Sequence, residues 1–188
     1  MDEAGRGPLA GPVVAAAVAF DSQPCVEGLA DSKRLTPSLR EALFEEITRT
    51  AAAVSIGMAN SHEIDEHNIL QATFLAMRRA YTALNYEVTE IWVDGNQDPG
   101  LPVVTRTIVE GDALVPAISA ASVIAKVTRD RLMVRFDETY PGYGFAQHKG
   151  YPTAAHLAQL AALGPCSIHR YSFKPVRTVV DALSGLAT

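Results

Sequence analysis

Four acidic residues lie at positions in the sequence where an acid is hard to explain as an ordinary solvent-exposed residue. Asp2 and Glu3 precede a glycine-rich turn that leads into an apolar segment. Asp94 follows the apolar run 91–93, and Asp112 lies between an expected strand and an expected helix. The ends of strands are where an α/β sheet exposes its functional side chains. Each acid alone also fits a turn or a cap, because Asp-Gly is itself a turn signal.

Convergence of these four carboxylates would require bound cations. Like charges in a pocket of low dielectric repel one another strongly, and a metal ion offsets that repulsion. Hard oxygen ligands without His or Cys favour Mg²⁺ or Mn²⁺ over zinc and copper. The sequence therefore predicts a Mg²⁺ or Mn²⁺ site if the strand ends meet.

The charge of the chain is unevenly distributed. The formal net charge of −5 argues at first against a nucleic-acid partner, since phosphate binding usually leaves a basic footprint. Residues 1–116 carry eight Lys and Arg against seventeen Asp and Glu, whereas residues 117–177 carry eight against three. An acidic half and a basic half suit a metal-dependent nuclease, with carboxylates for metals and cations for phosphates. Both sets equally fit a solvated surface.

Other motifs do not match a known chemistry. The glycines of segment 5–11 fit neither a dinucleotide-binding fingerprint nor a P-loop, and the segment leads into a strand instead of a helix. His62 and His67 resemble a zinc-protease pair but are one residue too far apart, so that on a helix they would point about 140° apart. Cys25 and Cys166 have no disulfide-framework or zinc spacing, which fits a reducing cytoplasm.

The length of 188 residues is typical of one domain with a single core. The longest apolar run, 9–20, is interrupted by Gly11 and Pro12, and no basic-then-apolar leader precedes it. It is too short and too broken to span a bilayer. We therefore expect a cytoplasmic protein without a membrane segment.

Strands and helices alternate along the expected elements. Thr36 followed by Pro37 is a good N-cap and first helical residue. Small residues on the first turns of a helix from Pro116 to about 136 allow it to approach other backbone closely. The alternation predicts an α/β domain. The remaining expected elements are strands over 13–20, 54–59, 90–93 and 103–109, helices over 68–84, 153–163 and 174–183, and a loop over 140–144.

Several longer motifs occur in a fixed order. They are Asp-Glu-Ala-Gly-Arg-Gly at 2–7, Leu-Ala-Gly-Pro-Val at 9–13, Asp-Ser-Lys-Arg-Leu at 31–35, Val-Asp-Gly-Asn at 93–96, Gly-Asp at 111–112, Ile-Ser-Ala-Ala-Ser-Val-Ile-Ala-Lys-Val-Thr-Arg-Asp at 118–130 and His-Lys-Gly-Tyr at 148–151. Together they resemble the signatures of the ribonuclease HII family, the type 2 ribonucleases H, over nearly the whole chain.

The resemblance implies a fold and a reaction. The fold is α/β, RNase H-like, with a central mixed sheet flanked by helices. It implies a single catalytic domain over residues 1–188, with a core over about 1–140 and a helical C-terminal extension over about 141–188. The reaction is hydrolysis of the RNA strand of RNA/DNA hybrids, and cleavage on the 5′ side of single ribonucleotides in duplex DNA. The ends produced are 5′-phosphate and 3′-hydroxyl.

The resemblance also assigns roles to residues. Asp2, Glu3, Asp94 and Asp112 match the family's four catalytic, metal-binding acids, which implies Mn²⁺ or Mg²⁺, as two ions when substrate is bound. One ion would activate a water molecule, and the other would stabilise the leaving 3′ oxygen. No covalent intermediate with the protein is required.

Recognition of the ribonucleotide falls on two segments. Gly5, Arg6 and Gly7 match the motif that reads the 2′-hydroxyl, where missing side chains let backbone groups come close. Arg6 would add a phosphate contact. Tyr151 matches the tyrosine that packs on the sugar at the RNA–DNA junction, a role that suits an aromatic ring with a polar tip. Without the resemblance, Tyr151 would be interpreted as an ordinary core or surface residue.

Phosphate contacts are implied for three further residues, Lys33, Ser122 and Lys126. Ser122 and Lys126 are four residues apart and share a helix face. Asp130 is kept out of the metal set, because we expect it to pair with a basic neighbour such as Arg129 or Arg131. Three other arginines are expected to be solvated surface: Arg34, Arg78 and Arg79.

Two other functions compete with an active nuclease. Family members have several residues before the Asp-Glu pair, whereas only Met1 precedes Asp2 here. A shortened first strand would leave Asp2 at a fraying terminus and give a catalytically impaired hybrid-binding module. A carboxylate-metal phosphatase of small substrates shares the acids but leaves the Gly-Arg-Gly turn unexplained. The expected partners are RNA/DNA hybrids and ribonucleotide-containing DNA, bound by a monomer, and a sliding clamp is left open.

Overall fold

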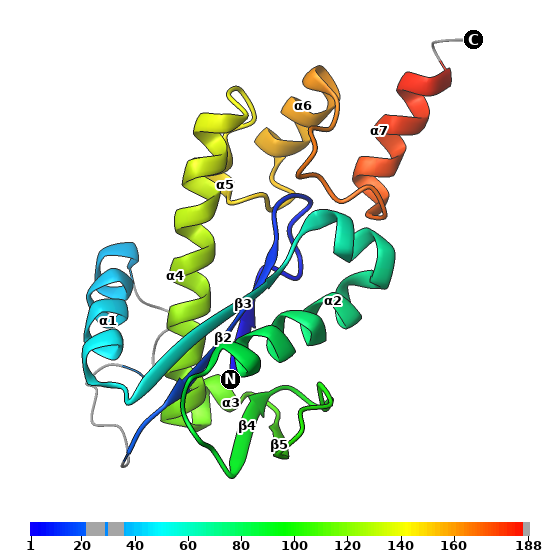
Figure 1. Cartoon of the computed structure of the whole chain (residues 1–188). Helices are drawn as coiled ribbons and strands as arrows, with labels where there is room; N and C mark the ends of the chain where they lie inside the picture. Colours follow the sequence, from blue (N-terminus) through cyan, green and yellow to red (C-terminus); the bar gives the residue numbers. More distant parts are fainter. Residues whose placement is uncertain (22–28, 30–35, 186–188) are drawn as a thin grey trace.

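A computed structural model describes residues 1–21, 29 and 36–185 (Figure 1). Strands and helices alternate through most of it, and the chain then ends in helices. In chain order the elements are β1 (Asp2–Ala4), β2 (Val13–Ala19), α1 (Pro37–Thr50), β3 (Ala53–Ala59), α2 (Ser61–Ala83), β4 (Glu90–Asp94), β5 (Val104–Ile108), α3 (Gly111–Leu114), α4 (Pro116–Thr139), α5 (Phe145–His148), α6 (Ala154–Leu163) and α7 (Lys174–Gly185).

The short strand β1 lies at the centre of the sheet. It pairs antiparallel with β2, where Asp2 faces Ala16, and β2 pairs antiparallel with β3. On the other side β4 and β5 pair in parallel. Two backbone hydrogen bonds join the two groups of strands. The nitrogen of Met1 donates to the oxygen of Trp92 at 2.8 Å, and the nitrogen of Asp94 donates to the oxygen of Met1 at 3.0 Å. The order is therefore β3-β2-β1-β4-β5, and the expected mixed sheet is confirmed.

The expected fraying around Asp2 is wrong. Met1 is 4% exposed and Asp2 is 5% exposed. Both lie between β2 and β4, and backbone hydrogen bonds hold this segment on either side. A strand paired along both edges and buried among side chains opens far less readily than a free end. Asp2 is consequently fixed in the middle of the sheet.

Helices cover both faces of the sheet (Figure 1). Successive residues of β2 point to opposite faces, as strand geometry requires. Ala15 and Ala17 join the core beneath α2, whereas Ala16 and Val18 join the core beneath α1 and α4. This double burial explains why β2 is apolar throughout its length. Three of the small residues on the first turns of α4 are fully buried, which confirms the predicted close approach: Ala120, Ala121 and Ala125.

Side chains cap the N-termini of α1, α2 and α6. Thr36 Oγ1 accepts from the backbone nitrogen of Leu39 at 3.4 Å, and Thr153 Oγ1 accepts from that of His156 at 3.2 Å. α2 begins earlier than predicted, because a capping box at Asn60 starts a first segment at Ser61. Asn68, with φ of 67°, then interrupts the helix, and its side chain caps the second segment. The polar stretch before Asn68 has little apolar periodicity, so its start is marked in the sequence by the capping-box spacing of Asn60 and Glu63 and not by an apolar stripe.

The last three helices lie beyond one end of the sheet (Figure 1). Leu9 packs with Leu160 of α6 and Val176 of α7 in a small core of its own. An isolated β-bridge joins Ala10 to His169. The C-terminal segment thus packs directly against the loop between β1 and β2. No helix in the described part of the chain is long and apolar enough to cross a membrane.

Candidate active site

The pairing of β1 with β4 brings three of the predicted acids together. Burial raises the pKa of Asp2 to about 8, and the charges of Glu3 and Asp94 add to the shift. Burial also raises the pKa of Glu3, against the opposing effect of the nearby Arg6 guanidinium. Such shifts require carboxylates that are both desolvated and close to one another. Figure 1 marks the N-terminus close to β4, in agreement with the hydrogen bonds that Met1 makes with Trp92 and Asp94.

Asp112 joins this group from the turn that begins α3. Its backbone nitrogen lies 3.4 Å from Asp94 Oδ1, and its side chain is 3% exposed. Gly111 makes this approach possible, since a Cβ there would lie 3.4 Å from the same oxygen and 2.7 Å from Ile118 Cδ1. The four acids predicted from the sequence therefore occupy one region of the structure.

The donor set fits hard divalent cations. Its members are oxygen donors only. Burial, followed by the charges of Glu3 and Asp94, raises the pKa of Asp2, and a bound cation would oppose that shift. Within residues 1–21, 29 and 36–185, no three His, Cys, Asp or Glu side chains are placed so that they could hold a metal ion among themselves. An open set of this kind suits Mg²⁺, which keeps several water ligands and shares substrate phosphate oxygens.

A cleft of about 400 Å³ opens beside Glu3. It collects residues from β1, the following loop, α1, α4 and the segment after α5. Six of the predicted substrate-binding residues line it: Gly5, Arg6, Gly7, Ser122, Lys126 and Tyr151. Arg40 also lines the cleft, and sequence reasoning missed it because a single Arg on an exposed helix face carries no distinguishing pattern. Lys33, Arg34 and Cys25 lie outside the described residues.

Tyr151 forms one wall of this cleft. Its side chain is 40% exposed, and its ring faces Gly7, where an added Cβ would lie 3.8 Å from the ring carbon Cε1. Two cations flank the ring: Lys126 Nζ lies 5.8 Å and Arg129 Cζ 5.9 Å from its centroid. A ring held between a glycine and two cations offers a flat stacking surface next to positive charge.

Ion pairs set the positions of the charged residues that line the cleft. Arg6 reaches Glu3 Oε1 at 3.4 Å, and Lys126 Nζ donates to Asp130 at 2.7 Å. Asp130 does pair with a basic residue, but the expectation of Arg129 or Arg131 is wrong, because the helix places Lys126 one turn away on the same face. Arg131 instead pairs with Glu41.

Two arginines of the basic half are buried and therefore do not face solvent, where they could bind a substrate phosphate. Arg129 donates to the carbonyl oxygens of Ala10 and Pro12, both at 3.0 Å, and to that of Lys149 at 2.9 Å. The interpretation of the whole basic half as a phosphate-binding surface is therefore wrong at this position. Burial lowers the pKa of Arg129 to about 10, and the guanidinium remains charged at neutral pH.

Arg170 is the second buried arginine. It donates to the carbonyl oxygens of Gly5 at 2.6 Å, of Arg6 at 2.9 Å and of Gly11 at 3.0 Å. Burial, followed by the charge of Arg129, lowers its pKa to about 9. Arg170 thus holds the Gly-Arg-Gly turn directly, whereas Arg129 lies beside Gly5 and binds the later part of the same loop at Ala10 and Pro12. The sequence offered no sign of this, since a buried Arg and a surface Arg look alike in a sequence.

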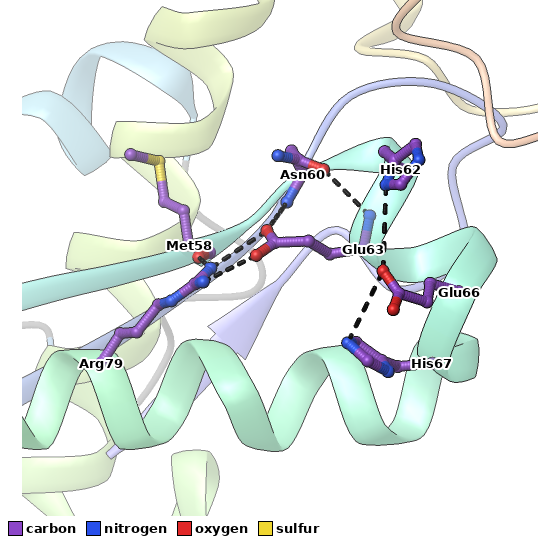
Figure 2. A network of polar contacts seen from close by, with 7 residues as sticks. All are labelled: Met58, Asn60, His62, Glu63, Glu66, His67 and Arg79. Carbon is purple, nitrogen blue, oxygen red and sulfur yellow. Dashed lines mark hydrogen bonds and ion pairs between the residues drawn. The ribbon is translucent and has the colours of Figure 1, made fainter.

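The network around Arg79 corrects another expectation (Figure 2). Arg79 donates to Glu63 at 2.6 and 3.0 Å and to the carbonyl oxygen of Met58 at 2.7 Å. This hydrogen bonding lowers the pKa of Glu63. The pair links the first turn of α2 to its second segment and to β3, so Arg79 is not simply solvated surface. Arg78 likewise donates to the oxygen of Pro99 at 2.9 Å.

The two histidines near this network do not form a metal pair. His62 Nδ1 and His67 Nε2 each lie 4.0 Å from Glu66 Oε2, on opposite sides of that carboxylate in Figure 2. The side chain of His62 is largely exposed, and that of His67 is about half exposed. The exclusion of the zinc-protease interpretation agrees with this arrangement.

Comparisons with known proteins agree with the fold. The crystal structure of ribonuclease H2 from Pyrococcus horikoshii superposes with a TM-score of 0.78 at 30% identity, over 97% of this chain and 96% of that one. Ribonuclease HII from Archaeoglobus fulgidus, solved in a complex with PCNA, gives a TM-score of 0.72 at 28% identity, over 92% and 93%. The fold is thus that of a ribonuclease H.

Sequence comparison shows to which ribonuclease H family the chain belongs. The family model "Ribonuclease HII" matches residues 1–176. Ribonuclease HII of Polaromonas sp. is 57% identical over 180 residues, which cover 96% of this chain and 90% of that protein. The chain belongs to the ribonuclease HII family, and it is a ribonuclease H enzyme.

Proposed function

We propose that this enzyme hydrolyses the RNA strand of RNA/DNA hybrids and also cuts on the 5′ side of single ribonucleotides embedded in duplex DNA. The products would carry 5′-phosphate and 3′-hydroxyl ends. The observation that carries the proposal is the shared cleft, where Glu3 lies in the same cavity as the Gly-Arg-Gly turn and Tyr151. A group that recognises a sugar and a group that supports hydrolysis must lie this close to act on one nucleotide.

The protein's own residues divide the work in this proposal. The backbone at Gly5 and Gly7 would meet the 2′-hydroxyl, because only absent side chains allow contact this close. Tyr151 would stack on the adjacent sugar. Arg6 and Lys126 would bind phosphate oxygens after exchanging their ion pairs with Glu3 and Asp130 for contacts with substrate.

Asp2, Glu3, Asp94 and Asp112 would hold Mn²⁺ or Mg²⁺, as two ions when substrate is bound. When bound, such ions supply a nucleophilic water and stabilise the charge on the leaving 3′ oxygen. Before binding, burial raises the pKa of Asp2 and of Glu3. They are therefore poised to gain free energy from a cation, and a family of metal-dependent hydrolases fits that donor set.

The test is cleavage of a labelled DNA duplex that contains one ribonucleotide, with Mg²⁺, Mn²⁺ or EDTA. An all-DNA duplex and the Asp94→Asn variant serve as controls. We expect metal-dependent cutting on the 5′ side of the ribonucleotide, none with EDTA, and none of the all-DNA duplex. A folded enzyme that cuts only long hybrids would remove single-ribonucleotide cleavage from the proposal. Normal cleavage by Asp94→Asn would reject the assignment of the acids.

A sliding clamp is a further proposed partner. The Archaeoglobus fulgidus relative was solved in a complex with PCNA. We expect co-elution of this protein with a clamp in gel filtration, and separate elution at micromolar concentrations would reject the proposal.

We also propose that the enzyme acts as a monomer and that its domain divides near residue 140. Gel filtration without the clamp tests the first, and limited proteolysis tests the second.

A further inference from the structure

A buried chain of hydrogen bonds runs behind Tyr151. The backbone nitrogen of Cys166 donates to His169 Nδ1 at 3.0 Å. His169 Nε2 lies 3.2 Å from His156 Nε2, and His156 Nδ1 lies 3.0 Å from the carbonyl oxygen of Tyr151. His156 and His169 are both fully or almost fully buried, and neither touches the cleft itself.

The two ends of this chain fix where the protons sit. A backbone N–H can only donate, so His169 Nδ1 must be the unprotonated, accepting nitrogen. His169 therefore carries its proton on Nε2 and donates to His156. His156 must accept at Nε2 and carry its own proton on Nδ1, which then donates to the oxygen of Tyr151. A carbonyl oxygen can only accept, so both ends require the same single arrangement.

The surroundings keep both rings neutral. Burial lowers the pKa of His169 to about 4, and burial lowers the pKa of His156 as well. His148 stacks on His156 with ring centroids 4.2 Å apart, and Phe145 meets the same ring edge-on at 5.6 Å. His156 also stands in the first turn of α6, where the helix dipole disfavours positive charge. A second proton on either ring would leave two donors facing each other.

The backbone before Tyr151 is held by other partners. Gly150 donates through its nitrogen to His148 Nδ1 at 3.1 Å, and its oxygen accepts from the nitrogen of Leu9 at 2.8 Å. The oxygen of Lys149 accepts from Arg129. The oxygen of Tyr151 is the next acceptor along the chain, and it accepts from two donors, the backbone nitrogen of Thr153 at 2.8 Å and His156 Nδ1 at 3.0 Å. The two bonds together hold the Tyr151 carbonyl group, and the one from His156 is the contribution of a side chain outside this turn.

We propose that His156 and His169 are positioning residues for Tyr151. His169 fixes the tautomer of His156, and His156 holds the Tyr151 carbonyl so that the ring faces Gly7 across the cleft. The inference rests on the proposed function in one respect, namely that the ring of Tyr151 contacts the substrate. Neither histidine takes part in the chemical step.

The first test needs no substrate. Nitrogen-15 NMR of histidine-labelled enzyme at pH 7 distinguishes the two neutral tautomers of each ring. We expect His156 to be protonated on Nδ1 and His169 on Nε2, assigned by the loss of each signal in the His156→Asn and His169→Gln variants. The opposite tautomers, or rapid exchange between tautomers at either ring, would overturn the inference whatever the activity of the enzyme.

The second test measures coupling to Tyr151. His156→Ala removes the donor, whereas His156→Asn keeps an amide nitrogen near the position of Nδ1. We expect His156→Ala to raise KM for a single-ribonucleotide duplex about three- to tenfold, the effect of one lost hydrogen bond, and His156→Asn to restore most of it. In a Tyr151→Ala background the same substitution should change KM less than twofold. Thermal unfolding checks that each variant is folded, and exposed His62→Ala is the control.

The outcomes separate the two proposals. Equal effects of His156→Ala with and without Tyr151 would refute positioning and leave a purely structural role. A Tyr151→Ala enzyme that binds and cuts like the parent would instead refute the proposed role of Tyr151 in the substrate site. The tautomer measurement would still decide whether the hydrogen-bonded chain exists.

Discussion

Gly5→Ala should destabilise the protein far more than its backbone conformation alone requires. Gly5 has φ of +97°, and Gly95 has φ of +102°. A Cβ at Gly95 would meet nothing within 4 Å, whereas a Cβ at Gly5 would lie 2.1 Å from Arg129 Nε and 2.8 Å from the oxygen of Pro12. The two glycines thus share a conformation and differ in their surroundings. Comparison of the two alanine variants isolates the packing contribution.

The expected difference follows from what Arg129 must give up. The left-handed conformation costs an alanine about 1–2 kcal/mol at either site. At Gly5 the guanidinium must also move, and it makes three hydrogen bonds to carbonyl oxygens. The loss of three bonds at about 1 kcal/mol each adds roughly 3 kcal/mol, and more if the charge stays buried without partners. We expect a loss of about 1–2 kcal/mol for Gly95→Ala and about 4–5 kcal/mol for Gly5→Ala.

Urea unfolding of the metal-free proteins, followed by circular dichroism, measures both free energies. Gly100→Ala is a second control, since Gly100 has φ of +71° and open space at its Cβ position. Equal losses for Gly5→Ala and Gly95→Ala, within about 1 kcal/mol, would refute the view that Arg129 fills the space beneath this loop. Failure of Gly5→Ala alone to fold would support it.

Three further predictions concern the cleft, the acids and the histidines. Gly7→Ala should change the free energy of unfolding by less than about 1 kcal/mol, because its Cβ would only touch Tyr151 at 3.8 Å. It should nevertheless lower cleavage at a ribonucleotide at least tenfold, because the methyl group obstructs the sugar. A loss of stability as large as the loss of cleavage would contradict this. Asp94→Asn should abolish cleavage and raise metal-free stability by about 1 kcal/mol, since it relieves repulsion from Glu3 and Asp2, and calorimetry should show no heat of Mn²⁺ binding. The free energy of unfolding should fall as the pH is lowered from about 6.5 to about 4. In this range His169 is protonated in the unfolded state but stays neutral in the folded state, where its pKa is lowered to about 4. That loss is at most roughly 3 kcal/mol from this ring, and thermal unfolding of His169→Gln should show a flatter pH profile; an unchanged profile would contradict the assignment.

Local structure could be predicted wherever a few neighbouring residues decide it. Thr36 and Thr153 cap their helices because each side chain reaches a backbone nitrogen only a few positions ahead. The apolar run of β2 required burial on both faces, and both faces are covered. The early start of α2 was missed because its reason is a capping box in a polar stretch, and not an apolar stripe.

The sequence by itself determined the kinds of residue that the site contains. The acids stand out because Asp2, Asp94 and Asp112 follow or precede apolar segments, and the motifs that surround them resemble one family. Proximity was a different matter. Asp2 and Asp94 meet because β1 pairs with β4 across more than ninety residues of sequence, a contact that no local preference encodes.

Tertiary structure alone decided the roles of the buried polar residues. In the sequence, Arg129 and Arg170 resemble two more phosphate-binding cations. In the structure both are buried and donate to carbonyl oxygens of the loop between β1 and β2. His156 and His169 carry no recognisable spacing, yet the packing of α6 against the segment that follows it joins them to Tyr151. The residue type determines the charge of a side chain. Its hydrogen-bond partner depends on which backbone groups, distant in the sequence, the fold buries next to it without another partner.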